Sequence, residues 1–215
     1  MLKLVDSKLD VMMSVIPSVY LAFENTGSVP MKIGSKYDSV EEPSVMLIDD
    51  DGNELEVVNK IITVPNTILP GERGFAEIKF WNIPKGAIPV DFKVTFTGAQ
   101  VRNYPIERIF MDATAAVEYL EPPYNEERGL VATVSNPTDY SYFLDDGYIA
   151  LLDHEGKLVY FAKFPFRIKK ISITPGNSVK IVVQKFRDVQ IRSNLKDVDY
   201  ENSIIKVWFD IKNEN

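Results

Sequence analysis

The stretch VMLIDDDGNEL (residues 45–55) has a counterpart in IALLDHEGKLV (residues 149–159), which lies 104 residues further along the chain. In the first segment an apolar run leads to Asp49, and Gly52 follows three residues later; the second segment keeps the same spacing. Glycine tolerates the positive φ that a tight hairpin turn requires. Both segments are therefore expected to be β-hairpins with an Asp-x-x-Gly tip.

Further pairs of segments recur in the same order, and the offsets of all the pairs lie between 104 and 113 residues. Each pair shares turn residues or the same alternation of apolar and polar residues. The pairs are YLAFENTGSVPM (20–31) with LVATVSNPTDYSYF (130–143), ILPGERGFAEIKF (68–80) with ITPGNSVKIVVQKF (173–186), and FKVTFTG (92–98) with IKVWFDI (205–211). An ordered set of landmarks of this kind predicts two homologous domains, residues 1–108 and 112–215.

Short apolar or alternating runs separated by turn residues occupy most of the chain, which is typical of an all-β sandwich or barrel. The fold class expected is all-β, with two tandem immunoglobulin-like antiparallel β-sandwich domains related by an internal repeat. A jelly-roll-like or arrestin-like protein with two lobes is the alternative. One short helix is expected over residues 188–196. The expected strands are residues 2–5, 19–23, 45–48, 54–58, 75–80, 92–97, 115–120, 130–135, 148–152, 158–161, 179–184 and 204–211.

The order of these motifs resembles the immunoglobulin-like modules of bacterial and archaeal proteins, including FxLYD-type domains and the late-embryogenesis-abundant/WHy group. In such modules a strand ends in an Asn-Pro or Asn-Thr-Gly turn, as at Asn136 and Asn25 here, and a D-x-[DE]-G hairpin and a Pro-Gly turn follow. The resemblance covers residues 20–97 and 130–210. It implies an immunoglobulin-like fold and a protein that binds other proteins or acts as a spacer, and it brings no catalytic residues.

Composition excludes several kinds of site. The 215 residues contain no cysteine, which excludes disulfide bonds, thiolate zinc sites and cysteine nucleophiles, and suits a cytoplasmic or thermophilic protein. Histidine occurs once, at His154, where a hairpin tip favours an exposed side chain over a catalytic triad. The net charge of −7 is spread over both halves, so nucleic acid is not an expected partner.

The sequence contains no apolar run of 18 residues, so no membrane span is expected. The first 23 residues lack the continuous apolar segment of a signal peptide, because charged residues and Pro17 interrupt them. The expected location is therefore cytoplasmic, with a removed leader and a surface or virion location left open.

Asp49, Asp50 and Asp51 are the candidate metal ligands. A calcium-binding EF-hand loop has ligands at positions 1, 3, 5 and 12 and glycine at position 6. With the glycine placed there, position 1 is Leu47 and position 12 is Val58, so both ends of the cage are missing. The stretch is therefore expected to be a solvated hairpin tip, with a weak cation site as the alternative. No cofactor is expected.

Tyr140, Tyr142, Phe143 and Tyr148 are the candidate surface for a partner or ligand. Exposed tyrosines stack on sugars or anchor a protein partner, since they combine a large apolar face with a polar group. Alternate residues of a strand, however, face the core. Both interpretations of this aromatic stretch remain open from the sequence.

The function expected is a non-enzymatic binding or structural module that acts through protein–protein contacts, with itself or with another protein. Strand-edge pairing or an aromatic patch would supply the contact. The alternatives are a carbohydrate-binding β-sandwich that takes a glycan, a virion or cell-surface structural component, and a hydrolase that uses an unidentified pair of carboxylates.

Overall fold

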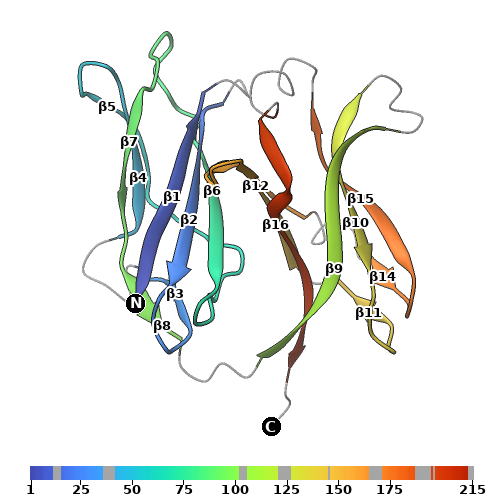
Figure 1. Cartoon of the computed structure of the whole chain (residues 1–215). Helices are drawn as coiled ribbons and strands as arrows, with labels where there is room; N and C mark the ends of the chain where they lie inside the picture. Colours follow the sequence, from blue (N-terminus) through green and yellow to red (C-terminus); the bar gives the residue numbers. More distant parts are fainter. Residues whose placement is uncertain are drawn as a thin grey trace. The chain divides into compact units, whose positions relative to one another are not determined.

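The computed structural model divides into two compact units, Met1–Tyr104 (unit 1) and Pro105–Asn215 (unit 2) (Figure 1). Strand β9 begins at Ile106, so the domain limits expected from the sequence, residues 108 and 112, lie inside this strand. The expected helix over residues 188–196 lies outside the described residues except for Leu195. The structure describes residues 1–11, 16–35, 42–101, 106–120, 127–144, 146–164, 171–186, 195 and 197–212.

The regular structure in these described ranges is β-strand, and every strand pair is antiparallel. The all-β class expected from the sequence is therefore confirmed, and each expected strand overlaps an observed one. Unit 1 contains β1 (Leu2–Asp10), β2 (Ser18–Asn25), β3 (Met31–Ile33), β4 (Ser44–Ile48), β5 (Glu54–Val58), β6 (Arg73–Lys79), β7 (Asp91–Thr95) and β8 (Gly98–Gln100). Unit 2 contains β9 (Ile106–Tyr119), β10 (Arg128–Ser135), β11 (Tyr142–Phe143), β12 (Asp146–Asp153), β13 (Leu158–Lys163), β14 (Ser172–Ile173), β15 (Ser178–Phe186) and β16 (Val198–Lys212).

In unit 1 two three-stranded sheets share one core. β2 lies between β1 and β6 in the first sheet, and β4 lies between β5 and β7 in the second. Side chains alternate across a strand, so Val19, Leu21 and Phe23 of β2 point to one face, as do Val45 and Leu47 of β4. All five belong to one buried apolar cluster. The two sheets therefore contact each other through these faces.

Unit 2 orders its strands in the same way and adds one feature. β10 lies between β9 and β15, and β12 lies between β13 and β16. The added feature is the length of β9, whose residues 106–111 pair with β16 while residues 112–119 pair with β10. Because β9 changes partner along its length, it joins the two groups of strands into one six-stranded sheet.

A buried asparagine closes the end of β2. The side-chain amide of Asn25 donates hydrogen bonds to the carbonyl oxygens of Val29 at 2.8 Å and Ile68 at 2.9 Å, and its Oδ1 accepts from the N–H of Gly27 at 3.0 Å. The carbonyl of Asn25 accepts from the N–H of Gly71, which has a positive φ of 74°. One side chain thus ties the Asn-Thr-Gly turn to the Pro-Gly turn that precedes β6.

Asn136 closes the end of β10 through equivalent hydrogen bonds. Its amide donates to the carbonyl oxygens of Tyr140 at 2.7 Å and Ile173 at 3.0 Å, and its Oδ1 accepts from the N–H of Thr138 at 3.0 Å. Its carbonyl accepts from Gly176, whose φ is 68°. The asparagines and Pro-Gly turns that mark the sequence are therefore one structural element in each unit.

Candidate functional site

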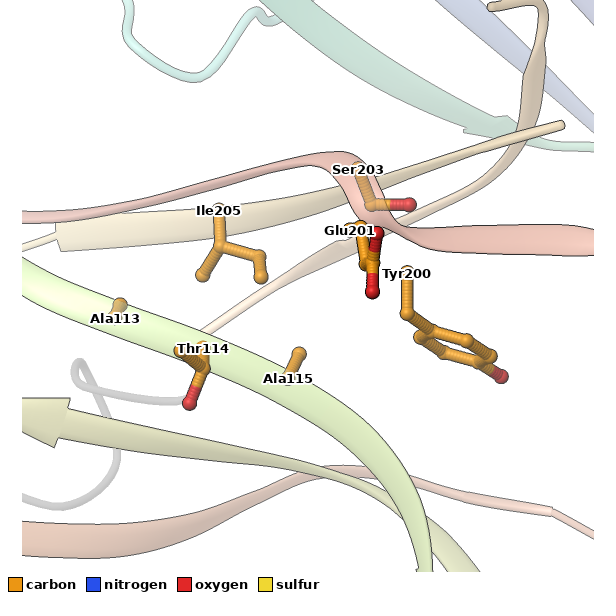
Figure 2. Close-up of a pocket in the computed structure, with 7 residues that line it drawn as sticks. All are labelled: Ala113, Thr114, Ala115, Tyr200, Glu201, Ser203 and Ile205. Atoms are coloured by element: carbon orange, nitrogen blue, oxygen red, sulfur yellow. The ribbon is translucent and has the colours of Figure 1, made fainter. Parts of the chain in front are cut away.

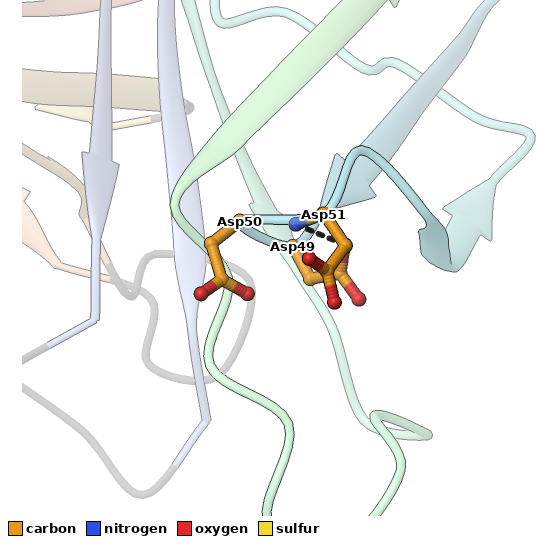
Figure 3. Close-up of side chains that lie close together, drawn as sticks. All are labelled: Asp49, Asp50 and Asp51. Atoms are coloured by element: carbon orange, nitrogen blue, oxygen red, sulfur yellow. Dashed lines mark hydrogen bonds between the residues drawn. The ribbon is translucent and has the colours of Figure 1, made fainter.

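The acidic stretch of Asp49, Asp50 and Asp51 forms the tip of the β4–β5 hairpin. Oδ1 of Asp49 accepts the N–H groups of Asn53 at 2.7 Å and Asp51 at 3.1 Å, and Oδ2 accepts the Asn53 side chain at 3.1 Å. The Asn53 side chain is the main reason that the pKa of Asp49 lies below its ordinary value. The three carboxylates offer oxygen atoms within 4.8 Å of one another (Figure 3). Asp49 therefore shapes the turn, and a weak cation site at Asp49, Asp50 and Asp51 stays a prediction.

The β12–β13 hairpin uses its aspartate in the same manner. Oδ1 of Asp153 accepts the N–H groups of Lys157 and Glu155, each at 2.9 Å. The Lys157 N–H bond is the main cause that lowers the pKa of Asp153. The residues that differ between the two tips are exposed, so the shared aspartate shapes the turn and the variable residues face water.

The aromatic stretch of unit 2 separates into exposed and buried members. Tyr140 is 70% exposed and Phe143 is 62% exposed. Tyr142 is half-buried and stacks on Phe209 with ring centroids 3.6 Å apart. Tyr140 and Phe143 are therefore the members that a ligand or partner can reach.

The interpretation of Tyr148 as part of a partner surface is wrong, because its side chain is fully buried. Its ring centroid lies 6.1 Å from that of Trp208 and 6.1 Å from that of Phe161. The central residues of β12 are buried on both faces of the strand, so alternation along the strand exposes neither side. Tyr148 is a core residue.

Strand β16 contains a large bulge. Ala150 pairs with Ile204 and Leu152 pairs with Asp199, so residues 200–203 have no partners on β12. The Asp199 carboxylate accepts the N–H groups of Glu201 at 3.1 Å and Asn202 at 3.2 Å, and the Asn202 side chain at 2.7 Å. The Asn202 side chain is the main cause that lowers the pKa of Asp199. These hydrogen bonds hold the bulge in a defined shape.

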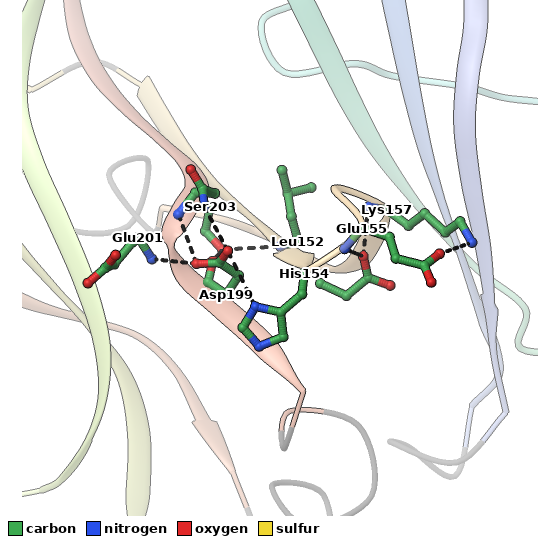
Figure 4. A network of polar contacts seen from close by, with 9 residues as sticks. Leu152, His154, Glu155, Lys157, Asp199, Glu201 and Ser203 are labelled. Carbon is green, nitrogen blue, oxygen red and sulfur yellow. Dashed lines mark hydrogen bonds and ion pairs between the residues drawn. The ribbon is translucent and has the colours of Figure 1, made fainter.

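Ser203 and His154 complete the polar network around the bulge (Figure 4). Oγ of Ser203 donates to the carbonyl of Asp199 at 2.6 Å and accepts the N–H of Leu152 at 3.1 Å. Nδ1 of His154 lies 3.5 Å from Oδ2 of Asp199, and the His154 side chain is 76% exposed, as expected at a hairpin tip. The serine hydroxyl donates its proton to a backbone carbonyl, so this network supports the bulge rather than activating a nucleophile.

A cavity of about 350 Å³ opens where β9 and β16 diverge (Figure 2). The pairing of these strands ends at Met111 and Val207, and beyond that point β9 follows β10 while β16 enters its bulge. The lining residues are Ala113, Thr114, Ala115, Tyr200, Glu201, Ser203 and Ile205. We call this cavity the β9–β16 cleft.

The β9–β16 cleft borders an unpaired edge of β9. Ala113, Thr114 and Ala115 are consecutive, and Figure 2 shows that Thr114 points to the side opposite the two alanines. All three nevertheless line the cavity, so the cavity reaches the backbone at the edge of the strand. Within the described residues no strand pairs with this edge beyond Met111. Every second residue of β9 therefore directs its N–H and C=O groups away from β10.

The middle of this edge, residues 113–117, lacks the charges that usually protect an edge strand, although Asp112 and Glu118 flank it. Natural proteins place charged side chains on exposed edges to prevent unwanted pairing. The edge strand β1 carries Lys3, Asp6 and Lys8, whereas residues 113–117 of β9 read Ala-Thr-Ala-Ala-Val. β13 is also an uncharged edge over most of its length, but it is largely buried. Residues 113–117 of the β9 edge are thus accessible and carry no charge.

The polar groups of the β9–β16 cleft come from the bulge. Burial raises the pKa of Tyr200 above its ordinary value of 10.0, and its hydroxyl, protonated at neutral pH as in any tyrosine, can donate a hydrogen bond. Glu201 is exposed, and its carboxylate forms no ion pair or hydrogen bond with a described residue. The lining of the cleft therefore includes hydroxyl groups and one carboxylate beside apolar side chains.

A second polar cluster lies on the β1–β2–β6 sheet of unit 1. Burial raises the pKa of Glu77, and Asp10 adds to this effect, while Lys79 at 3.3 Å opposes it. The hydroxyl of Tyr20 lies 3.5 Å from Oδ2 of Asp10. This cluster makes unit 1 sensitive to pH.

Sequence reasoning missed the residues of the β9–β16 cleft. Two local signals were available: the run of small residues over 113–116, and the polar stretch at residues 199–203, which precedes the apolar part of β16. Neither signal identifies a site alone, because the cleft arises where two strands distant in sequence separate.

Comparisons of the chain with protein-family models, with curated proteins and with solved structures find no match. The described residues contain no helix long and apolar enough to cross a membrane.

Proposed function

We propose that this protein is a non-enzymatic binding or structural module, built from two tandem immunoglobulin-like β-sandwiches, that acts through protein–protein contacts. The order of strand pairing is the same in both units, and Asn25 and Asn136 make equivalent hydrogen bonds. These two observations support a repeated sandwich fold. The binding role itself is carried by one observation, the edge of β9 beside the β9–β16 cleft, which is unpaired within the described residues and uncharged over residues 113–117.

The contact proposed is the addition of a strand. An extended segment of a partner pairs its backbone with the free N–H and C=O groups of residues 112–119 and so lengthens the sheet. Backbone hydrogen bonds supply affinity, and the side chains that face the cleft supply selectivity. β9 is already held by β10 and, through residues 106–111, by β16, so the edge is in place before the partner arrives.

The test uses a phage-displayed library of random twelve-residue peptides, selected on the full chain. Synthetic copies of the enriched peptides are titrated into ¹⁵N-labelled protein and followed by NMR. We expect the amide resonances of residues 112–119 to shift. Two N-methylated versions of each peptide, modified at odd or at even positions, separate backbone pairing from side-chain adhesion, because the two backbone edges of a strand alternate.

One N-methylated version is expected to bind like the parent peptide, and the other is expected to lose binding. Two results would contradict strand addition: both N-methylated versions bind like the parent peptide, or the peptide shifts no resonance of β9.

A carbohydrate-binding role is the second candidate, and the exposure of Tyr140 and Phe143 is the observation that favours it. Exposed aromatic rings stack on sugar faces. Binding to a panel of soluble polysaccharides, lost in the Tyr140→Ala/Phe143→Ala double variant, would support this role. Tyr142 is left unchanged in the test because its stacking on Phe209 gives it a structural part.

A further inference from the structure

We infer that the β9–β16 cleft selects its partner: it accepts an extended segment of another protein with one apolar side chain facing inward and a lysine or arginine close to it. This inference rests on the proposed function and adds the chemistry of the partner.

The requirement for an apolar side chain follows from the inward face of β9. Ala113 and Ala115 point into the cleft, yet both are only half-buried, and Ile205 faces them from β16 in the same state. Inward positions of a β-sheet normally carry large residues that fill the space between layers. Two alanines instead leave room, and a cavity of about 350 Å³ lies within the usual size range of ligand pockets, about 300–1,000 Å³. A branched apolar side chain of an added strand fills this room.

The requirement for a basic side chain follows from the bulge of β16. Glu201 lines the cleft with a carboxylate that no described residue pairs. The bulge holds its backbone in place, because the N–H of Glu201 is bonded to the Asp199 carboxylate and Ser203 is bonded to the carbonyl of Asp199. A negative charge beside a strand edge, paired with no described residue, favours a cationic side chain on the incoming strand.

The same charge argues against a second copy of this chain as the occupant. Pairing of one β9 edge with the β9 of another copy would bring Asp112 of that copy to an edge that already has Glu201 beside it, whereas Glu118 is ion-paired with Lys180. Like charges placed together oppose association. The favoured occupant is therefore a different protein that presents a basic, apolar strand.

The experiment starts from the peptides selected on the full chain and uses two pairs of variants. Ala115→Leu fills the cleft, and Gln184→Leu is its control, because it places the same side chain at an exposed position of β15, which β10 separates from β9. Glu201→Lys reverses the charge in the cleft, and Asp50→Lys is its control, because it makes the same change of net charge at the exposed tip in unit 1. The NMR spectrum of each variant verifies that it folds.

We expect the enriched peptides to alternate apolar and polar residues and to contain lysine or arginine. Ala115→Leu should weaken their binding by about tenfold, Glu201→Lys by about fivefold, and each control by less than about twofold. A peptide with its basic residue changed to glutamate should regain affinity for the Glu201→Lys protein.

Two results would overturn the inference in different ways. Peptides that shift β9 but bind the Ala115→Leu and Glu201→Lys proteins as well as their controls would refute the chemistry of the partner and leave strand addition standing. Peptides that never shift β9 would refute the inference together with the proposed function.

Discussion

Units 1 and 2 contain the same turns but differ along one strand. This strand is β1, which pairs with β2, in unit 1 and β9, which pairs with β10, in unit 2. Positions on β2 and β10 can be matched by counting back from Asn25 and Asn136. The residues three and five positions before the asparagine pair with Asp6 and Lys8 of β1 in unit 1, and with Thr114 and Ala116 of β9 in unit 2. Both edges carry a charge near each end, at Lys3 and Asp10 in β1 and at Asp112 and Glu118 in β9, but only β1 also carries charges in the middle. The residues that the units share hold the turns together, so the fold constrains them. Residues on free edges and exposed tips differ between the units as well, and at such places a function can vary with little cost to the fold.

The largest effect is expected at the shared asparagines. Asn25→Ala and Asn136→Ala each remove the donors of two hydrogen bonds to carbonyl groups and should lower the free energy of unfolding by about 2–4 kcal/mol. Hydrogen exchange measured by mass spectrometry reports on each unit separately. Similar losses of stability, each confined to the unit that carries the substitution, would support the equivalence of Asn25 and Asn136. A negligible effect of either substitution would contradict the equivalence of the two asparagines.

A smaller effect is expected when the β9 edge is given the charges of β1. The Thr114→Asp/Ala116→Lys double variant should bind the selected peptides at least about tenfold more weakly, because an incoming strand would have to pack against charged side chains. Both positions are exposed, so the stability should change by less than about 0.5 kcal/mol. Ser28→Asp/Gln100→Lys adds the same charges at exposed positions of unit 1 and is the control. Unchanged affinity in the β9 variant would place the binding surface elsewhere.

The glycines at the two hairpin tips should respond alike. Gly52 and Gly156 have φ values of 82° and 79°, and a methyl group added at either would meet no atom within 4 Å. Substitution by alanine therefore costs only the strain of a left-handed backbone, about 1 kcal/mol in each case. Chemical denaturation of the two single variants measures this cost. A difference of more than about 1 kcal/mol between them would show that the hairpins are not equivalent.

The smallest effect is a fall in the stability of unit 1 as the pH rises above about 4.5, which Glu77 causes. The pKa of Glu77 is raised in the folded state above its ordinary value of 4.5, whereas the matching position on β15 is Val182. As the pH rises through 4.5 towards the raised pKa, the unfolded chain loses its proton first, so the free energy of unfolding falls. Glu77→Gln should remove this fall in unit 1. Hydrogen exchange across this pH range, with unit 2 as the internal reference, measures the stability of unit 1. A stability of unit 1 that stays constant or rises with pH would contradict the prediction.

Much of the fold was predictable from local pattern. Alternation in residues 75–80 predicts β6, and the Asp-x-x-Gly spacing predicts both hairpin tips, because these features depend on residues close in sequence. The short strands β3, β8, β11 and β14 were missed, since two or three residues are too few to show a period.

The candidate site was not predictable because it depends on pairing between distant segments. The predicted strand over residues 204–211 omits residues 198–203, whose polar side chains are typical of a turn. Only the pairing of Leu152 with Asp199 shows that the strand resumes beyond a bulge. In the same way, burial of β12 on both faces, and not its own sequence, decides that Tyr148 is a core residue.

The most direct test of the unguarded β9 edge is amide hydrogen exchange of residues 113–117, measured by NMR with and without a saturating selected peptide. We expect alternate amides of the free protein to be protected by β10 and the remaining ones to exchange rapidly. The rapidly exchanging amides should slow by at least about tenfold in the complex. Protection of all five amides in the free protein, or unchanged exchange in the complex, would contradict the assignment of this edge as the binding surface.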